Sequence, residues 1–578
     1  MKKIINLLFI LFIIFLIINP IWFRNNELII GLGLLFLILD SIIIVFNKKN
    51  FKIDFCDILI ILLPISYLLP YIFNKNVYLF KNSIFFIILE FIFSLTLLVM
   101  RRFVTVKKIN ILLTTILIIS TMYFFIPFIC QVWPKIMGLW GIFAYFGDTY
   151  LNSVDRFYGT FDYCNASALL FAISILISLF KLSKDDNYGC IYQFLFFINC
   201  LGFLITFSKM LTIGLVITLI FLVIYLVFYK QKKFFKIIIL NISASLIPLL
   251  IMVGKYRDFL INLNIFIFLI WLVCSYIVYL LLYKLFILIY KKRLLYYFLV
   301  IMMIFVIGMM GLNVISIPLR INNVLNNNQV ILTDFVLQKG VEYKIELELD
   351  IYDRSNVSFS LCRRFLEKLH PQEEIIDTKI ENNIIRFSLI ASEAEYYYIK
   401  INNLNKKTDL NIKSMSINNE NYLINSLLIP YAYIHQLDLI KYDKESVTHR
   451  LWYYIDSLHI LSDYGFFIGQ GKDTFAYYAS SYDYNYLEKN PHSYLFQLWL
   501  DVGIYGVIYV ILLVVGGFYW IIKERKVKNK IIWFSIFILC ILVLPFDAIY
   551  NILFFRVLLI ISFLLVCDNK IGKKRFNK

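Results

Sequence analysis

The sequence lacks the cysteine patterns that build disulfide frameworks or zinc sites. Its nine cysteines, among them Cys56, Cys190, Cys274 and Cys540, are scattered mostly inside apolar runs. They form neither CxxC pairs nor any arrangement with zinc-ligand spacing. We therefore interpret them as small apolar fillers.

A signal-peptide cleavage site is also missing. Lys2 and Lys3 precede an apolar run as they would in a signal peptide, but no small-residue cleavage site follows. The next apolar run begins soon afterwards. We therefore expect the N-terminal run to be the first membrane helix.

Long apolar runs dominate what the sequence does contain. The chain has 578 residues, of which 61% are hydrophobic, and its mean hydropathy is +0.78. Runs of about 20 apolar residues match the roughly 30 Å thickness of a hydrocarbon core, and no soluble domain needs so many of them. The sequence therefore predicts an α-helical integral membrane bundle in a lipid bilayer. The net charge of +18 does not by itself indicate a nucleic-acid partner, because Lys and Arg gather on the cytoplasmic side of membrane proteins.

Fourteen runs are predicted to span the membrane, within a range of about 12 to 14 helices. They are residues 4–22, 27–47, 53–73, 77–100, 109–131, 164–180, 189–207, 210–229, 237–254, 259–290, 296–318, 496–522, 531–547 and 550–567. Basic clusters such as Lys48-Lys49 occupy every second loop, while the short loops between them hold isolated charges. This asymmetry predicts a multi-pass protein of the plasma membrane with both termini in the cytoplasm.

The predicted orientation divides the chain into three parts. Residues 1–318 form an N-terminal transmembrane bundle with a motif loop at 132–165. Residues 319–495 form an extracytoplasmic loop, with an inserted β-sandwich at about 328–420 and a second motif loop at about 440–495. Residues 496–578 supply the C-terminal transmembrane helices and a basic cytoplasmic tail.

Alternation of polar and apolar residues predicts the β-sandwich. Residues 341–349 alternate at period two, as a half-buried strand does. Residues 397–401 and 410–417 repeat the pattern and predict a hairpin. Such an extracytoplasmic domain either binds carbohydrate or serves as a spacer or packing module, and the second interpretation is the simpler one.

Two polar segments lie at helix junctions on the predicted outer face. The first runs from Arg156 to Ala168, where the first long loop meets a span. An Arg beside a glycine turn is commonly a snorkelling interfacial residue. The second, Thr206 to Met210, brings the cation Lys209 to the outer interface, and a short turn between helices would look the same.

The third polar segment belongs to the large outer loop. It contains Arg450 and Trp452, then a glycine-rich run at 465–471, and then His492 directly before a span that includes Asp501. The glycines permit tight turns but do not lead from a strand into a helix, so a nucleotide-phosphate loop is not indicated. A lone His without a second ligand at suitable spacing is most often structural.

Charged residues also occur within the predicted spans. They are Asp40, Glu90, Asp501 and Arg556. Such groups are expensive in lipid and are either functional or paired between helices. Pairing or an interfacial position is the simpler interpretation, and Asp501, nine residues after His492, is the strongest functional candidate.

Taken in order, the three segments resemble the O-antigen ligase/polymerase family, which comprises integral membrane glycosyltransferases that use lipid-linked oligosaccharide. The likeness lies in Arg-x-x-Gly-Thr-Phe-x-x-x-Asn-x-x-Ala from Arg156, Ser-Lys at 208–209, and Arg-x-Trp at 450–452. It continues with Gly-x-Gly-x-x-x-Phe from Gly469 and His-Ser-Tyr-Leu from His492, followed by Gly-x-x-Gly. It covers about residues 110–230 and 440–520, so the β insert and several spans lie outside it.

The resemblance implies transfer of a glycan from an undecaprenyl-diphosphate carrier to an acceptor hydroxyl at the outer membrane face, without nucleotide sugar, obligatory metal or cofactor. It makes 440–495 a catalytic loop in which His492 is the general base or orients the acceptor, since imidazole titrates near working pH. Arg156 and Arg450 would hold the diphosphate. Lys209 would join them, although the family usually has Arg there, and Lys lacks the planar fork. The possible supporting residues are Asn165, Ser208, Gly469, Gly471 and Asp501.

Several alternatives stay open at the level of sequence. A polymerase is slightly preferred to a ligase, and the acceptor is a glycan, a lipid or a protein. A polysaccharide or lipid transporter or flippase would also be polytopic, but its expected signs are matching halves and helices broken near the midplane. No convincing repeat is visible. A third interpretation is that the protein is a sensor or assembly scaffold that presents its β-sandwich to glycans.

Overall fold

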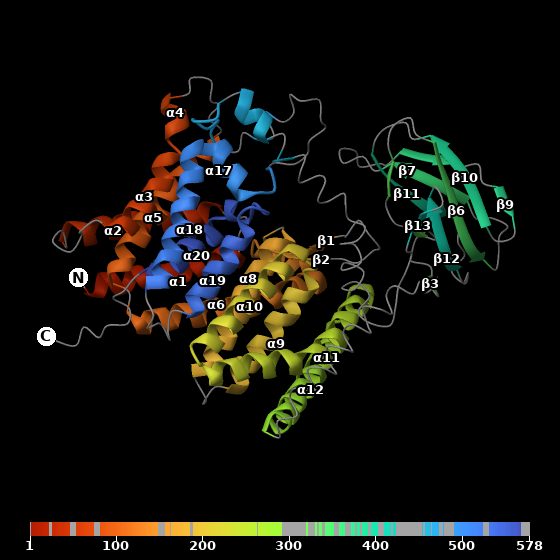
Figure 1. Cartoon of the computed structure of the whole chain (residues 1–578), viewed down its shortest axis with the longest axis horizontal. Helices are drawn as coiled ribbons and strands as arrows, with labels where there is room; N and C mark the ends of the chain where they lie inside the picture. Colours follow the sequence, from red (N-terminus) through yellow and green to blue (C-terminus); the bar gives the residue numbers. More distant parts are fainter. Residues whose placement is uncertain are drawn as a thin grey trace.

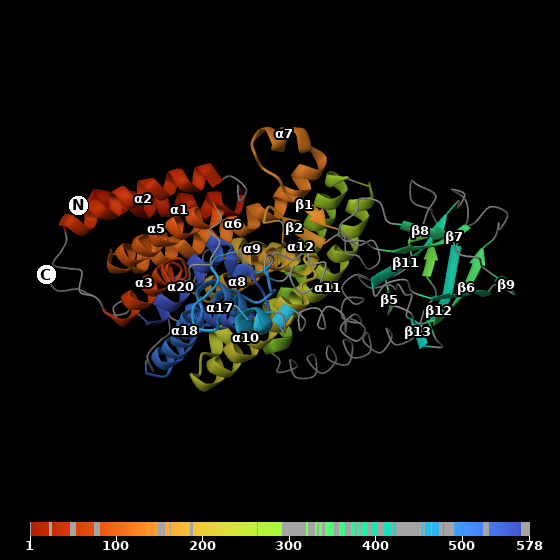
Figure 2. The ribbon, with the colours of Figure 1, turned by 90° about the horizontal axis from the view of Figure 1, so that it is seen from above.

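A bundle of apolar helices forms most of the protein, and most of the β-strands lie to one side of it (Figures 1 and 2). The computed structural model describes residues 2–21, 26–46, 54–73, 81–103, 105–147, 156–161, 163–184, 189–262, 264–291, 319–321, 330–331, 335–337, 342–351, 358–363, 372–375, 379–381, 384–390, 395–402, 410–417, 420–422, 453–454, 457–463, 465–472, 475, 478, 490–523 and 531–567.

The helices follow the predicted apolar runs closely. They are α1 (Lys2–Ile21), α2 (Asn26–Phe46), α3 (Phe55–Ser66), α4 (Leu69–Phe73), α5 (Lys81–Phe103), α6 (Val106–Val132), α7 (Pro134–Leu139), α8 (Cys164–Lys184), α9 (Gly189–Ile205), α10 (Lys209–Phe228), α11 (Lys232–Asn262), α12 (Ile265–Lys291), α17 (Tyr494–Val502), α18 (Ile504–Lys523), α19 (Ile531–Val543) and α20 (Leu553–Cys567). Seven of the helices in the described ranges are long and apolar enough to cross a membrane. The chain is therefore a multi-pass helical membrane protein, as predicted.

Two predicted spans are each broken into two helices. Residues 53–73 form α3 and α4, because Pro70, the second residue of α4, has no N–H with which to continue α3. Residues 496–522 form α17 and α18, because Gly503 between them has a φ of +77°. The predicted span at 296–318 lies outside the described residues.

Helix α8 lies at the centre of the bundle and carries the first polar segment. It contacts α6, α9, α10, α11 and α19, and nearly all its residues are buried. The approach of α9 depends on Gly202, where a Cβ would overlap the ring of Phe171. Small residues at the beginning of α8, including Ala166 and Ala168, are fully buried. The strands β1 (Tyr145–Gly147) and β2 (Arg156–Gly159) pair antiparallel and lie against α6, with β2 also against α8 (Figure 2).

Two antiparallel sheets occupy the region of the predicted insert. Their strands are β3 (Leu319–Ile321), β4 (Val330–Ile331), β5 (Phe335–Leu337), β6 (Glu342–Ile351), β7 (Ser358–Arg363), β8 (Gln372–Ile375), β9 (Lys379–Glu381), β10 (Ile384–Ile390), β11 (Glu395–Asn402), β12 (Leu410–Ile417) and β13 (Glu420–Tyr422). One sheet has the order β13-β12-β6-β10-β9, with β3 also pairing with β12. The other has the order β4-β11-β7-β8, with β5 also pairing with β11.

The period-two pattern at 341–349 is confirmed as a strand. In β6, Ile345 is fully buried while Glu342 and Lys344 are exposed. The predicted hairpin is wrong, because β11 and β12 pair within different sheets. Alternation specifies which face of a strand is buried but not which strand lies beside it. The face-to-face packing that defines a β-sandwich stays a prediction.

Candidate functional site

Tyr123 of α6 holds the first polar segment in place through hydrogen bonds. The hydroxyl of Tyr123 lies 2.8 Å from Ser167 Oγ and donates to the carbonyl of Tyr158. Gly159, at a φ of +66°, lies directly over this tyrosine, and a Cβ there would overlap the phenol oxygen. The glycine of the motif is therefore needed both for its backbone conformation and for this close approach.

Arg156 projects from β2 to the turn between α9 and α10. Its Nε donates to the carbonyl of Thr206 at 2.9 Å, and its Nη2 donates to the carbonyl of Phe207 at 3.1 Å. Phe207 has a φ of +49°, so the guanidinium holds a turn with an unusual backbone conformation. A guanidinium has five N–H donors, so these two bonds leave donors for an anion. Arg156 thus joins the first polar segment to the second.

Asn165 and Ser208 complete the junction of these two segments. Ser208 is the N-cap of α10, and its hydroxyl donates to Asn165 Oδ1 at 2.6 Å. Lys209 is the first residue of α10. Asn165 and Ser208, two of the five possible supporting residues, therefore form one buried contact.

Asp547, which sequence reasoning missed, brings in a third part of the chain. It is fully buried in the turn after α19 and accepts from Asn165 Nδ2 at 2.6 Å and from the Tyr163 hydroxyl at 2.7 Å. Burial raises the pKa of Tyr163 well above its ordinary value, and the negative charge of Asp547 raises it further. The phenol therefore keeps its proton. Asn165 therefore bridges the hydroxyl of Ser208 and a buried carboxylate.

The segment around His492 is anchored to the same turn. The backbone N–H of Tyr494 donates to the carbonyl of Asp547 at 2.9 Å and to that of Leu544 at 3.0 Å. Ser493 caps α17. His492 is half-buried, has a φ of +50°, and stacks on the ring of Tyr453 at a centroid distance of 5.3 Å. His492 therefore lies two residues before Tyr494, the residue that is bonded to the turn containing Asp547.

The glycine-rich run folds against the corner between α17 and α18. Gly469 packs so closely on the backbone of Asp501 that a Cβ would overlap it, and Gly471 donates its N–H to the Asp501 carbonyl at 3.1 Å. At the corner itself, a Cβ on Gly503 would overlap the Phe467 carbonyl. These glycines allow two backbone segments to touch, and the close packing accounts for their clustering.

Lys472, which follows these glycines, is a second residue missed from the sequence. Its buried Nζ lies 3.6 Å from Asp501 Oδ2, while Gln497 Nε2 donates to Asp501 Oδ1 at 2.6 Å. Its backbone N–H donates to the hydroxyl of Tyr71 at 3.0 Å. A buried ammonium without a partner would be very costly, and Asp501 supplies the opposite charge.

The other charged residues of the spans are also placed. Arg556 and Glu90 form a buried pair between α20 and α5, with Nη2 3.0 Å from Oε2. This confirms the simpler interpretation of pairing between helices. The Arg556 guanidinium and Lys472 Nζ both lie over the ring of Phe86, at 4.3 and 4.9 Å from its centroid. Asp40 differs, because it accepts a hydrogen bond from the Thr96 hydroxyl at 2.7 Å.

The structure thus connects four of the nine site residues singled out in the sequence, namely Arg156, Asn165, Ser208 and, through its segment, His492. A continuous series of contacts runs from Arg156 through the Phe207 turn, Asn165 and Asp547 to the segment that holds His492. Arg450 and Trp452 lie outside the described residues. The sequence gives one signal for each of the two missed residues. Asp547 is a polar residue at a break between two apolar runs, and Lys472 is a cation beside clustered glycines. In the part of the chain that the structure describes, no three His, Cys, Asp or Glu side chains gather closely enough to hold a metal.

Comparisons with protein-family models, curated proteins and solved structures found no match to this chain.

Proposed function

We propose that the protein transfers a glycan from an undecaprenyl-diphosphate-linked oligosaccharide to an acceptor hydroxyl at the outer face of the plasma membrane. Its termini would then be cytoplasmic, as the distribution of Lys and Arg predicts. The observation that carries the proposal is that Asn165 and Asp547 join the segments of Arg156, Ser208 and His492. These segments are far apart in the chain, and each belongs to the motif order that resembles O-antigen ligases and polymerases.

The proposed reaction is a single displacement at the donor sugar. The acceptor oxygen forms a bond to the anomeric carbon, the bond between that carbon and the carrier phosphate oxygen breaks, and undecaprenyl diphosphate leaves with the electron pair. The imidazole of His492 accepts the proton of the acceptor hydroxyl. Arg156, whose two carbonyl bonds fix its orientation, offers its remaining donors to the leaving diphosphate, with Arg450 and Lys209 as further cations.

The buried pair of Lys472 and Asp501 supports this site indirectly. It fixes the glycine-rich run against α17, and the N-terminal end of α17 follows His492 directly. Asp501 is therefore proposed as a positioning residue and not as the base, since its carboxylate already faces Gln497 and Lys472. A polymerase is slightly preferred to a ligase, and the acceptor is a glycan, a lipid or a protein. We propose that the two sheets pack as a β-sandwich that serves as a spacer.

A polysaccharide or lipid flippase is the second candidate. It is favoured by the buried Arg556–Glu90 pair and by the span that breaks at Gly503, since ionisable groups and broken helices mark many transport pathways. A flippase would move the lipid-linked sugar without breaking the bond to phosphate. The two functions therefore differ in whether undecaprenyl diphosphate is released.

The test is glycan transfer by the purified full chain in lipid nanodiscs. We expect His492→Gln to lower the transfer rate by about 100-fold or more, because a general base contributes at least that factor. His459→Gln is the matched control, since His459 is an exposed histidine of the same loop, and it should keep the parental rate. Equal rates in the two variants would refute the assigned role of His492.

A further inference from the structure

An apolar cavity opens where four helix ends meet, at the start of α1, the end of α5, the start of α6 and the end of α20. Its empty volume, mouth included, is about 510 Å³. Phe12, Met100, Leu112 and Leu564 each supply part of its wall, one from each helix. No residue of the three polar segments that carry the proposed glycan transfer lines this cavity. The cavity is therefore a separate feature of the bundle.

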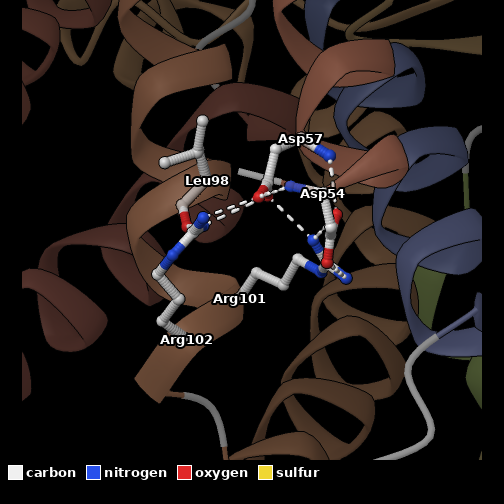
Figure 3. Close-up of polar contacts among 5 residues, drawn as sticks. All are labelled: Asp54, Asp57, Leu98, Arg101 and Arg102. Atoms are coloured by element: carbon white, nitrogen blue, oxygen red, sulfur yellow. Dashed lines mark hydrogen bonds and ion pairs between the residues drawn. The ribbon is translucent and has the colours of Figure 1, made fainter. Parts of the chain in front are cut away.

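Two cations, Arg101 and Lys108, also line this cavity. Arg101 is fixed by two carboxylates: its Nη1 lies 2.6 Å from Asp54 Oδ1 and 2.8 Å from Asp57 Oδ1 (Figure 3). Arg102 holds the other oxygen of Asp57 at 2.6 Å (Figure 3). The two carboxylates are thus already bound by two guanidinium groups.

Lys108 is the cation that this cluster does not neutralise. It is half-buried, and its Nζ lies 5.1 Å from the centroid of the Phe9 ring. No carboxylate in the described ranges lies within ion-pair distance of it. Among the described residues of this cluster, Lys108 is therefore the cation without a carboxylate partner, and it gives the mouth of the cavity an excess of positive charge.

We propose that the cavity binds an anionic phospholipid from the leaflet at this end of the bundle. An acyl chain fills the apolar interior, and the phosphate pairs with Lys108, with Arg101 behind it. A free phosphate would leave the apolar walls uncovered, and a zwitterionic lipid would bring its own cation next to Lys108. The bound lipid touches all four helices and so stabilises their packing.

Thermal unfolding of the purified full chain in neutral detergent tests this site. The probes are phosphatidylglycerol, phosphatidylcholine and inorganic phosphate, each titrated separately. We expect phosphatidylglycerol to raise the midpoint strongly, phosphatidylcholine to raise it much less, and inorganic phosphate to leave it unchanged. If inorganic phosphate raised the midpoint as much as phosphatidylglycerol does, the site would be a simple anion site. If phosphatidylcholine raised it as much, the site would be a lipid groove without charge selection. Either result would overturn the proposal.

Two variants locate the effect. Lys108→Gln should weaken the apparent affinity for phosphatidylglycerol about tenfold, the usual loss for one charge-assisted bond. Lys107→Gln, the exposed neighbour that does not line the cavity, should bind as the parent does. Leu112→Phe, which fills the cavity, should abolish the response to both lipids. A full response in Lys108→Gln or Leu112→Phe would refute the assignment, and neither outcome depends on glycan transfer.

Discussion

The side-chain amide of Asn165 donates a 2.6 Å hydrogen bond to the carboxylate of Asp547, across 382 positions of the chain. Asn165 is the second residue of the central helix α8, whereas Asp547 lies in the turn before the last helix. The same carboxylate accepts from Tyr163, and the backbone carbonyl of Asp547 accepts from Tyr494. This one residue therefore contacts both ends of the candidate site.

Asp547→Asn tests the joint directly. The carboxylate of Asp547 accepts from two donors, the Tyr163 hydroxyl and Asn165 Nδ2, and an amide has only one oxygen to accept with. One buried hydrogen bond is therefore lost, and one donor is left unsatisfied. We expect the free energy of unfolding to fall by about 1–3 kcal/mol, visible as a lower thermal midpoint of the purified protein. Asp463→Asn changes an exposed carboxylate in the same way and should shift the midpoint little. Similar midpoints for the two variants would mean that Asp547 does not hold the segments together.

Gly503→Ala probes the corner between α17 and α18. Its φ of +77° with a ψ of −158° is a conformation that essentially only glycine adopts, and a Cβ would also overlap the Phe467 carbonyl. We expect a loss of about 3 kcal/mol or more in stability. Gly254→Ala is the control, because a Cβ there meets no atom within 4 Å and alanine favours the helix. A Gly503→Ala protein as stable as the control would contradict the broken span.

Asp57→Asn should be strongly destabilising. Asp57 is fully buried and pairs with Arg101 and Arg102, which are 13% and 12% exposed (Figure 3). Removing one partner leaves buried charge uncompensated, at a cost of about 3–5 kcal/mol. The comparison is Glu346→Gln, which breaks the exposed pair with Arg386 at 2.8 Å and should cost at most about 1 kcal/mol. Chemical or thermal unfolding of both variants measures the difference.

Stability should also depend on pH through Asp54. Burial raises the pKa of this carboxyl, but the hydrogen bond and charge of Arg101 outweigh it and hold the pKa below the ordinary 3.8. A lowered folded-state pKa means that the pairing contributes fully above the unfolded-state pKa and is lost as the pH falls through the folded-state pKa. The thermal midpoint of Asp54→Asn should therefore fall less than that of the parent when the pH drops from about 5 to about 3. Parallel curves would contradict this pairing.

The helical part of the fold could be predicted because a bilayer leaves few alternatives for long apolar runs. The cost of a charge in lipid also predicted that Glu90 and Arg556 are paired between helices or lie at the interface, and the structure shows that they pair with each other. The break at Gly503 was missed, because glycine is common in membrane helices and its φ is not visible in a sequence.

The candidate site was less accessible to sequence reasoning. The order of motifs predicted that Arg156, Arg450 and His492 share one pocket. Arg450 lies outside the described residues, so that pocket stays a prediction, but contacts join the segments of Arg156, Ser208 and His492 in one network. Asp547 was missed because a single carboxylate in a short turn has no periodic signal. Its importance comes from contacts with residues hundreds of positions away, and one sequence carries no record of those contacts.

Release of the carrier is the most direct test of the proposed glycan transfer. Purified wild-type protein in nanodiscs would be given undecaprenyl-diphosphate oligosaccharide, and free undecaprenyl diphosphate and glycan length would be measured together. The proposed reaction predicts one released carrier for every new glycosidic bond, with release lost in His492→Gln and kept in His459→Gln. A donor that is neither bound nor consumed would contradict it, and a donor that crosses the membrane with its phosphate bond intact would favour the flippase.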